Sequence, residues 1–72
     1  MSRYHINIFW SEEDGAFVAD APDLESCSAL GSTREKALRE LDRAMKAWLA
    51  AARRAGRPIP KARYRPAIYQ AS

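Results

Sequence analysis

The chain of 72 residues has few of the groups that small proteins use for cross-links, metal sites or nucleophilic catalysis. It contains one cysteine and one histidine, which excludes an internal disulfide and a closed zinc site of about four Cys or His ligands. It also lacks a run of the ~20 apolar residues that a spanning helix needs, and its start lacks the apolar region of a signal peptide. We therefore expect a cytoplasmic protein without cofactor, metal or membrane contact, since a free thiol suits a reducing compartment.

The length predicts a single domain over residues 1–72. A domain this small buries only roughly 60% of the surface that its unfolded chain exposes, so its margin of stability is thin. Disulfides, metals or association usually supplement such a core, and only association is open to this chain. We expect a homo-oligomer, either a dimer or a tetramer. Trp10 is the candidate anchor, because tryptophan is enriched at the centres of interfaces.

Charge is distributed unevenly along the chain. Residues 1–32 carry one base and six acids, a net charge of −5, whereas residues 33–72 carry eleven bases and three acids, a net charge of +8. Such polarity suits either complementary contacts between subunits or two charged faces for different partners. An ordinary solvated surface is the alternative interpretation.

The first half of the chain reads as short strands joined by turns. Residues 3–10 alternate between apolar and polar side chains, which predicts a half-buried strand. The Asp-Gly pair at 14–15 predicts a turn, and residues 16–21 a second strand antiparallel to the first. Pro22 ends that strand because it has no amide hydrogen. Residues 28–30 could add a short third strand.

A long amphipathic helix is predicted over residues 33–55. Ser32 and Glu35 have the spacing of a capping box at its start, and Gly56 is placed to cap its end. Apolar side chains recur at helical spacing and form one face of this helix. They are Ala37, Leu38, Leu41, Ala44, Met45, Trp48, Leu49 and Ala52.

These elements define the fold class. The predicted helix must cover one face of the sheet to bury Leu38, Leu41, Met45 and Trp48. Residues 64–69 read as a closing strand, and Pro66 places it at an edge. We predict an α+β fold, an antiparallel sheet of three or four strands with one long helix packed on one face, in the order β-β-(β)-α-β.

Two groups of residues could form a catalytic site, but each also has a structural explanation. Asp14, Asp20, Asp23 and Glu25 could hold the metal ions of a nuclease, but Asp14 is a natural turn residue and Asp23 follows a proline in a loop. A nucleophilic pair of Cys27 and His5 is conceivable, but nothing in their spacing supports it. A lone cysteine is more often a small buried apolar residue. We expect no enzymatic activity and no catalytic residue.

Basic residues gather near the end of the chain and could contact a nucleic acid. Tyr64 and Tyr69 are close to them in the sequence and could stack on bases. The group therefore resembles a phosphate-binding surface with aromatic platforms. Its alternative role is to keep the helix end and an edge strand soluble. The group consists of Arg53, Arg54, Arg57, Lys61, Arg63 and Arg65.

An ordered set of short motifs, covering about residues 4–60, resembles the N-terminal domain of the HicB antitoxin family. Two positions depart from the family pattern, which has Pro-Gly where this chain has Glu25-Ser26, and Glu where it has Lys36. The matching residues are Tyr4, Asp14-Gly15, Phe17-Val18, Pro22-Asp23-Leu24, Cys27, Gly31-Ser32-Thr33 and Gly56-Arg57-Pro58-Ile59-Pro60.

The resemblance implies a partial ribonuclease H-like fold without catalytic carboxylates, assembled as oligomers of dimers. It also implies that the chain neutralises a small mRNA-cleaving toxin, HicA, by direct binding. Such toxins are basic, so the acidic half of this chain could cover the toxin's RNA-binding surface. The residues that we expect to bind the toxin are Glu12, Glu13, Asp20, Asp23 and Glu25.

Full-length antitoxins of this family usually carry a C-terminal DNA-binding domain, which has no counterpart in these 72 residues. We therefore expect no operator binding. Two other functions stay open, which are an oligomeric domain that binds RNA or another acidic partner through its basic half, and a nuclease relic with residual activity.

Overall fold

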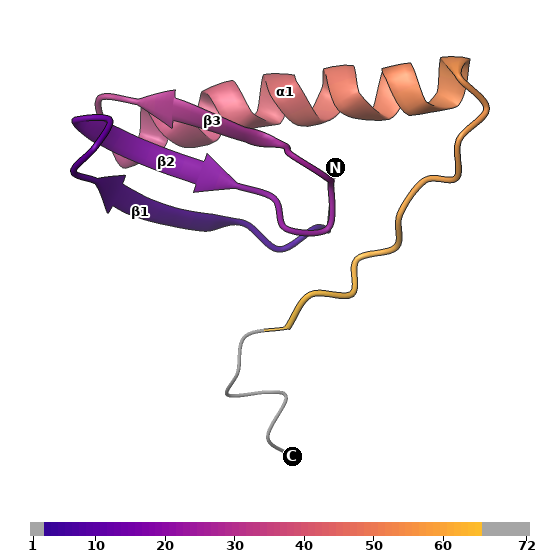
Figure 1. The fold of residues 1–72 in the computed structure, drawn as a ribbon, viewed down its shortest axis with the longest axis horizontal. Coiled ribbons are helices and arrows are strands. Elements are labelled where there is room, and N and C mark those ends of the chain that lie inside the picture. Colours follow the sequence, from indigo (N-terminus) through magenta and orange to yellow (C-terminus); the bar gives the residue numbers. More distant parts are fainter. Residues whose placement is uncertain (1–2, 66–72) are drawn as a thin grey trace.

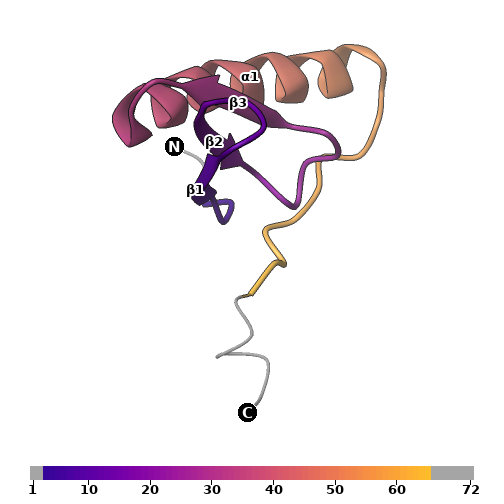
Figure 2. The ribbon, with the colours of Figure 1, turned by 60° about the vertical axis from the view of Figure 1, so that its left-hand side comes forward.

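The computed structural model describes residues 3–65, which form three strands followed by one helix (Figure 1). The strands β1 (Asn7–Ser11), β2 (Ala16–Asp20) and β3 (Ser28–Gly31) make an antiparallel sheet in the order β1-β2-β3. The helix α1 (Arg34–Arg54) packs mainly on β3 and β2, along one face of the sheet (Figure 2). The predicted α+β fold is thereby confirmed. Within residues 3–65, no helix has the length and apolar character needed to cross a membrane.

The first strand is shorter than the predicted residues 3–10. Asn7 pairs with Asp20 at one end of the β1–β2 ladder, and β2 ends there. The amide of Ala21 donates instead to the carbonyl of Cys27 across the β2–β3 loop, so the chain turns away just before Pro22. Residues 3–6 therefore have no neighbouring strand to pair with. The short third strand is confirmed, and it extends one residue further, to Gly31.

The turn between β1 and β2 is held by local hydrogen bonds. The Ser11 hydroxyl donates to the Asp14 carboxylate at 2.8 Å, and the Gly15 amide donates to the Ser11 carbonyl at 2.9 Å. Gly15 has a φ of +59°, a left-handed conformation that residues with a Cβ atom rarely adopt. The Asp-Gly pair thus acts as the sequence predicts.

The helix starts one residue later than the predicted capping box. Thr33, and not Ser32, is the N-cap, and its hydroxyl accepts the Lys36 amide at 3.1 Å. Its extended backbone (φ −134°, ψ 165°) is typical of an N-cap residue. Because the third helical residue is Lys36 rather than Glu, its side chain cannot accept the reciprocal bond, and only half of a capping box forms.

The helix ends in the glycine-containing cap that the sequence predicts. Gly56 has a φ of +71°, its amide donates to the Arg53 carbonyl, and the Arg57 amide donates to the Ala52 carbonyl. This pair of bonds is a Schellman motif and satisfies carbonyls that the last turn leaves unpaired.

Residues 57–65, which we call the C-terminal segment, leave the helix and return toward the sheet (Figure 1). The Tyr4 hydroxyl donates to the Pro60 carbonyl, and the Asp23 carboxylate accepts the amides of Arg63 and Tyr64. The segment contains no strand. The predicted closing strand is therefore absent at Tyr64 and Arg65, and its residues 66–69 lie outside the described part.

The core lies between α1, the inner face of the sheet and the β2–β3 loop. One prediction about it was wrong, since Leu38 is 37% exposed. Ala37 and Leu41, one turn apart, face the sheet, and Leu38 is turned about 100° away from Ala37 around the helix. Trp48 is half-buried. The buried side chains of this cluster are Ala19, Ala21, Leu24, Cys27, Ala37, Leu41 and Met45.

Candidate functional site

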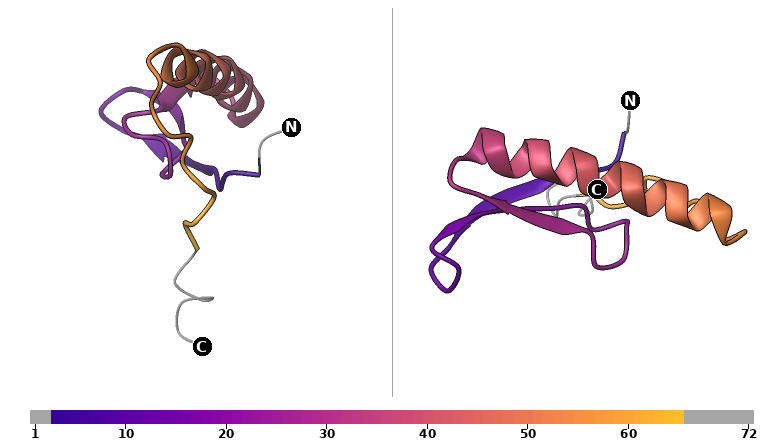
Figure 3. Two further views of the ribbon diagram at one scale, coloured as in Figure 1. Left: turned by 90° about the vertical axis from the view of Figure 1, so that its right-hand side faces the viewer. Right: turned by 90° about the horizontal axis from the view of Figure 1, so that it is seen from above.

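The face of the sheet opposite α1 carries an exposed row of apolar side chains. In the strand register, Phe9 pairs with Val18 and Val18 with Leu30, so the three lie side by side on one face. Ile8, Ala19 and Ala29 form the adjacent row on the helix side, and Ala19 is fully buried there. Phe9 is 51% and Leu30 is 49% exposed. We call Phe9, Val18 and Leu30 the open-face row; Figure 3 shows the helix on the other side of the sheet.

Acidic residues lie at both ends of the sheet that carries this row. Asp20, at the end of β2, is on the same face and pairs with Asn7 and Ser28. Glu12 and Glu13 are exposed in the turn at the opposite end of the hairpin, about 13 Å away along β2. The predicted toxin-binding acids therefore do not form one cluster. They flank an apolar centre, with Asp23 and Glu25 in the β2–β3 loop (Figure 1).

Two of the predicted toxin-binding residues have contacts within the chain. The Asp23 carboxylate accepts the amides of Arg63 at 3.2 Å and of Tyr64 at 3.1 Å. The backbone carbonyl of Glu25 accepts the Trp48 indole N–H at 3.0 Å, whereas the Glu25 side chain is exposed. Asp23 therefore holds the C-terminal segment against the β2–β3 loop, a role that only long-range contacts reveal.

The carboxylates considered for a nuclease do not converge. Asp14 is bonded within the β1–β2 turn, and Asp20 lies at the far end of β2. Across residues 3–65, no three His, Cys, Asp or Glu side chains come close enough together to hold a metal ion. This arrangement favours structural and surface roles for these acids over two-metal chemistry.

His5 and Cys27 have separate surroundings. The His5 Nε2 lies 2.8 Å from Asn7 Oδ1, and its ring lies 4.6 Å from the Tyr64 ring. Cys27 is 4% exposed within the core cluster. Burial, and secondarily the charge of Asp20, raises the pKa of the Cys27 thiol, which disfavours the thiolate that a nucleophile requires.

The raised pKa of Cys27 predicts slow thiol labelling. We expect Ellman's reagent at pH 7.5 to react with the folded chain roughly 100-fold more slowly than with the chain in urea, because the thiol is both buried and protonated. Absorbance at 412 nm measures the rate. The Asp20→Asn variant removes the lesser cause, so its labelling rate should increase slightly. Equal rates in the folded and the unfolded chain would contradict a buried position for Cys27.

The sign of the linked pH effect follows from the same shift. Because the folded pKa is raised, the protonated thiol contributes stability at pH values below its ordinary pKa. This contribution is lost as the pH rises through the folded pKa, since the unfolded chain ionises first. Labelling should therefore accelerate at alkaline pH for two reasons, more thiolate and more frequent opening.

The predicted nucleic-acid residues line the end of α1 and the C-terminal segment. All six are exposed, and the Arg65 guanidinium donates to the Tyr64 carbonyl at 3.0 Å. Tyr64 is 38% exposed and packs against His5, while Tyr69 lies outside the described residues. The residues in question, Arg53, Arg54, Arg57, Lys61, Arg63 and Arg65, thus follow an extended path rather than a compact patch.

Trp10, the candidate oligomer anchor, is 47% exposed on the helix side of the sheet. Its ring lies edge-on to Phe17, with centroids 5.1 Å apart, and the Arg34 guanidinium carbon lies 4.7 Å from the Phe17 centroid. Phe17, with Arg34 over its ring, therefore supports the Trp10 ring while leaving about half of that ring accessible.

Sequence reasoning missed the open-face row. The available signal was the alternation in the first strand, where Phe9 occupies an outward position otherwise held by polar side chains such as His5 and Asn7. Leu30 had no such signal, because the third strand is too short to establish an alternation. Comparison with known protein families, curated proteins and solved structures found no match to this chain.

Proposed function

We propose that this chain is a HicB-like antitoxin module that neutralises a small HicA-type, mRNA-cleaving toxin by binding it, without catalysis. The resemblance of the ordered motifs suggests the partner class. The observation that carries the proposal is the open-face row, flanked by Asp20 at one end of the sheet and by Glu12 and Glu13 at the other. An apolar centre with a charged rim is the usual anatomy of a protein interface.

The charges suit a basic partner in particular. Acids at the rim attract such a protein and orient it, and the apolar row supplies the area that water leaves on contact. Asp23 and Glu25 extend the acidic rim along the β2–β3 loop, although Asp23 also holds the C-terminal segment. On this proposal the antitoxin occupies the basic RNA-binding surface of the toxin and thereby prevents mRNA from binding there.

Charge reversal tests the proposal. We expect the triple variant Glu12→Lys, Glu13→Lys and Asp20→Lys to weaken toxin binding at least about ten-fold, because three rim attractions become repulsions. Isothermal titration calorimetry with a HicA-type toxin at low salt measures this change and also the stoichiometry. Low salt is chosen because surface electrostatics are strongest there.

The control is Glu40→Lys, a single acid-to-base change at an exposed position of α1 whose one ion pair within residues 3–65 is with Arg43. Its affinity for the toxin should equal that of the wild-type chain. Unchanged affinity of the triple variant at low salt would count against the proposal. A loss in the control as well would point to net charge rather than to this surface.

The proposal includes self-association of the antitoxin as a dimer or tetramer, with Trp10 as a contact. The thin core supports this part, since only eight residues of the described chain are buried apolar residues. The half-exposed and edge-packed Trp10 ring offers a rigid aromatic surface for such a contact.

A second candidate function is binding of RNA, or another acidic partner, through the basic residues of α1 and the C-terminal segment. It is favoured by the exposure of those six side chains along the helix end and the C-terminal segment, which also carries Tyr64. RNA affinity that falls steeply with salt would support it, since phosphate contacts release counterions. Toxin binding without RNA affinity would support the antitoxin proposal instead.

A further inference from the structure

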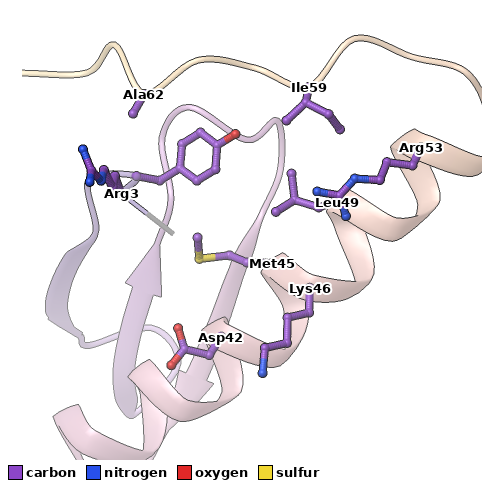
Figure 4. Close-up of a pocket in the computed structure, with 9 residues that line it drawn as sticks. Arg3, Asp42, Met45, Lys46, Leu49, Arg53, Ile59 and Ala62 are labelled. Atoms are coloured by element: carbon purple, nitrogen blue, oxygen red, sulfur yellow. The ribbon is translucent and has the colours of Figure 1, made fainter. Parts of the chain in front are cut away.

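A cleft of about 740 Å³ lies between α1, the residues before β1 and the C-terminal segment (Figure 4). It exists because α1 has 21 residues, about 31 Å, whereas each strand has at most five, so the helix extends beyond the sheet. The cleft is separate from the open-face row, which lies on the other face of the sheet. Its lining residues are Arg3, Tyr4, Asp42, Met45, Lys46, Leu49, Arg53, Ile59 and Ala62.

The floor of this cleft is apolar. Met45 is 3% exposed, Leu49 and Tyr4 are half-buried, and Ile59 is 39% exposed. The hydrogen bond from the Tyr4 hydroxyl to the Pro60 carbonyl joins the other two walls of the cleft, the residues before β1 and the C-terminal segment. These side chains offer contact to a hydrocarbon or aromatic group, and their burial would stabilise a complex.

The rim of the cleft is cationic. The charged residues that line it are three bases, Arg3, Lys46 and Arg53, and one acid, Asp42. The i,i+4 spacing of Asp42 and Lys46 favours an ion pair, but none forms, and the described chain holds neither arginine in an ion pair. Figure 4 shows Arg3 and Arg53 on opposite sides of the apolar floor.

We propose that this cleft binds a small amphipathic anion, a molecule with one carboxylate or phosphate group on an apolar body. The guanidinium groups suit the anionic group, because arginine can donate two parallel hydrogen bonds to it. Met45, Leu49 and Ile59 receive the apolar body. The volume of the cleft is within the range of small-molecule sites.

The test uses 8-anilinonaphthalene-1-sulfonate as a fluorescent probe and sodium decanoate as competitor, below its micelle concentration. We expect saturable fluorescence that decanoate displaces and that decan-1-ol, which lacks the charge, does not. Arg53→Gln should weaken decanoate binding on the order of five-fold. Arg54→Gln, the same change at the next residue of the same turn but outside the cleft, should leave it unchanged.

A second readout locates the ligand. The chain has two methionines, Met1 and Met45, so labelling with methyl-¹³C methionine gives at most two signals. The Met45 signal should move on decanoate saturation, and Phe9→Ser should not change decanoate affinity, since Phe9 lies on the other face of the sheet. An unmoved Met45 signal, equal displacement by decan-1-ol, or binding only to phosphatidylglycerol vesicles would overturn the proposal.

Discussion

Replacing Gly31 by alanine is expected to lower the free energy of unfolding by at least ~3 kcal/mol, much of what a chain of this size has. A Cβ atom on Gly31 would lie 2.3 Å from the Ala37 nitrogen, 2.7 Å from the Lys36 carbonyl carbon and 2.8 Å from the Ala37 Cα. These three atoms belong to the backbone of the first turns of α1, so no change of side-chain rotamer can relieve the clash. The helix would have to move off the sheet.

Urea unfolding followed by circular dichroism at 222 nm measures this loss. The matched control is Gly15→Ala, the same change at a glycine with φ +59° whose added Cβ would meet nothing within 4 Å. It should cost only the left-handed backbone strain, about 1 to 2 kcal/mol. If Gly31→Ala were no more costly than Gly15→Ala, the close approach of α1 to β3 would be wrong.

Leu41→Ala should lower the free energy of unfolding by about 2 to 5 kcal/mol, because it leaves a cavity in the core. Leu41 is fully buried between α1 and the sheet, and Leu24 is the only other described side chain of its size that is buried as completely. With so few large side chains in the core, little can move in to fill the space. The resulting variant should be partly unfolded near 37 °C.

Leu38→Ala is the control for this second prediction, since it makes the same chemical change three positions earlier on the same helix. Leu38 is 37% exposed, so its truncation should cost about 1 kcal/mol or less. Thermal unfolding of the two variants, compared with the wild-type chain, decides the matter. Equal costs would show that the buried stripe of α1 is rotated relative to its place in this structure.

The residues that carry the family resemblance hold the fold together. Asp14 and Gly15 make the β1–β2 turn, Asp23 ties down the C-terminal segment, Thr33 caps α1, and Gly31 permits the close contact between strand and helix. The functional proposal depends on the open-face row and its acidic rim, which share only Val18 and Asp23 with the resemblance motifs. The two charge-reversal variants and the stability variants therefore test separate properties of the molecule.

Short-range patterns were sufficient to predict most of the architecture. Alternation, an Asp-Gly turn and helical spacing located the first two strands and the helix to within a few residues, because these signals act between neighbours along the chain. The N-cap was placed one residue early, because Ser32 and Thr33 are chemically similar caps. The first strand begins four residues later than the pattern predicts, since its start depends on where its partner strand ends.

The sequence alone could not predict which side chains share a surface of the folded protein. Whether Phe9 and Leu30 share a face depends on the register of three strands, and a shift of one residue would reverse it. Leu38 is exposed, and Asp23 is bonded to residues forty positions away, because of how α1 and the C-terminal segment lie against the sheet. Contacts between segments distant in sequence determine these features, so patterns among neighbouring residues cannot predict them.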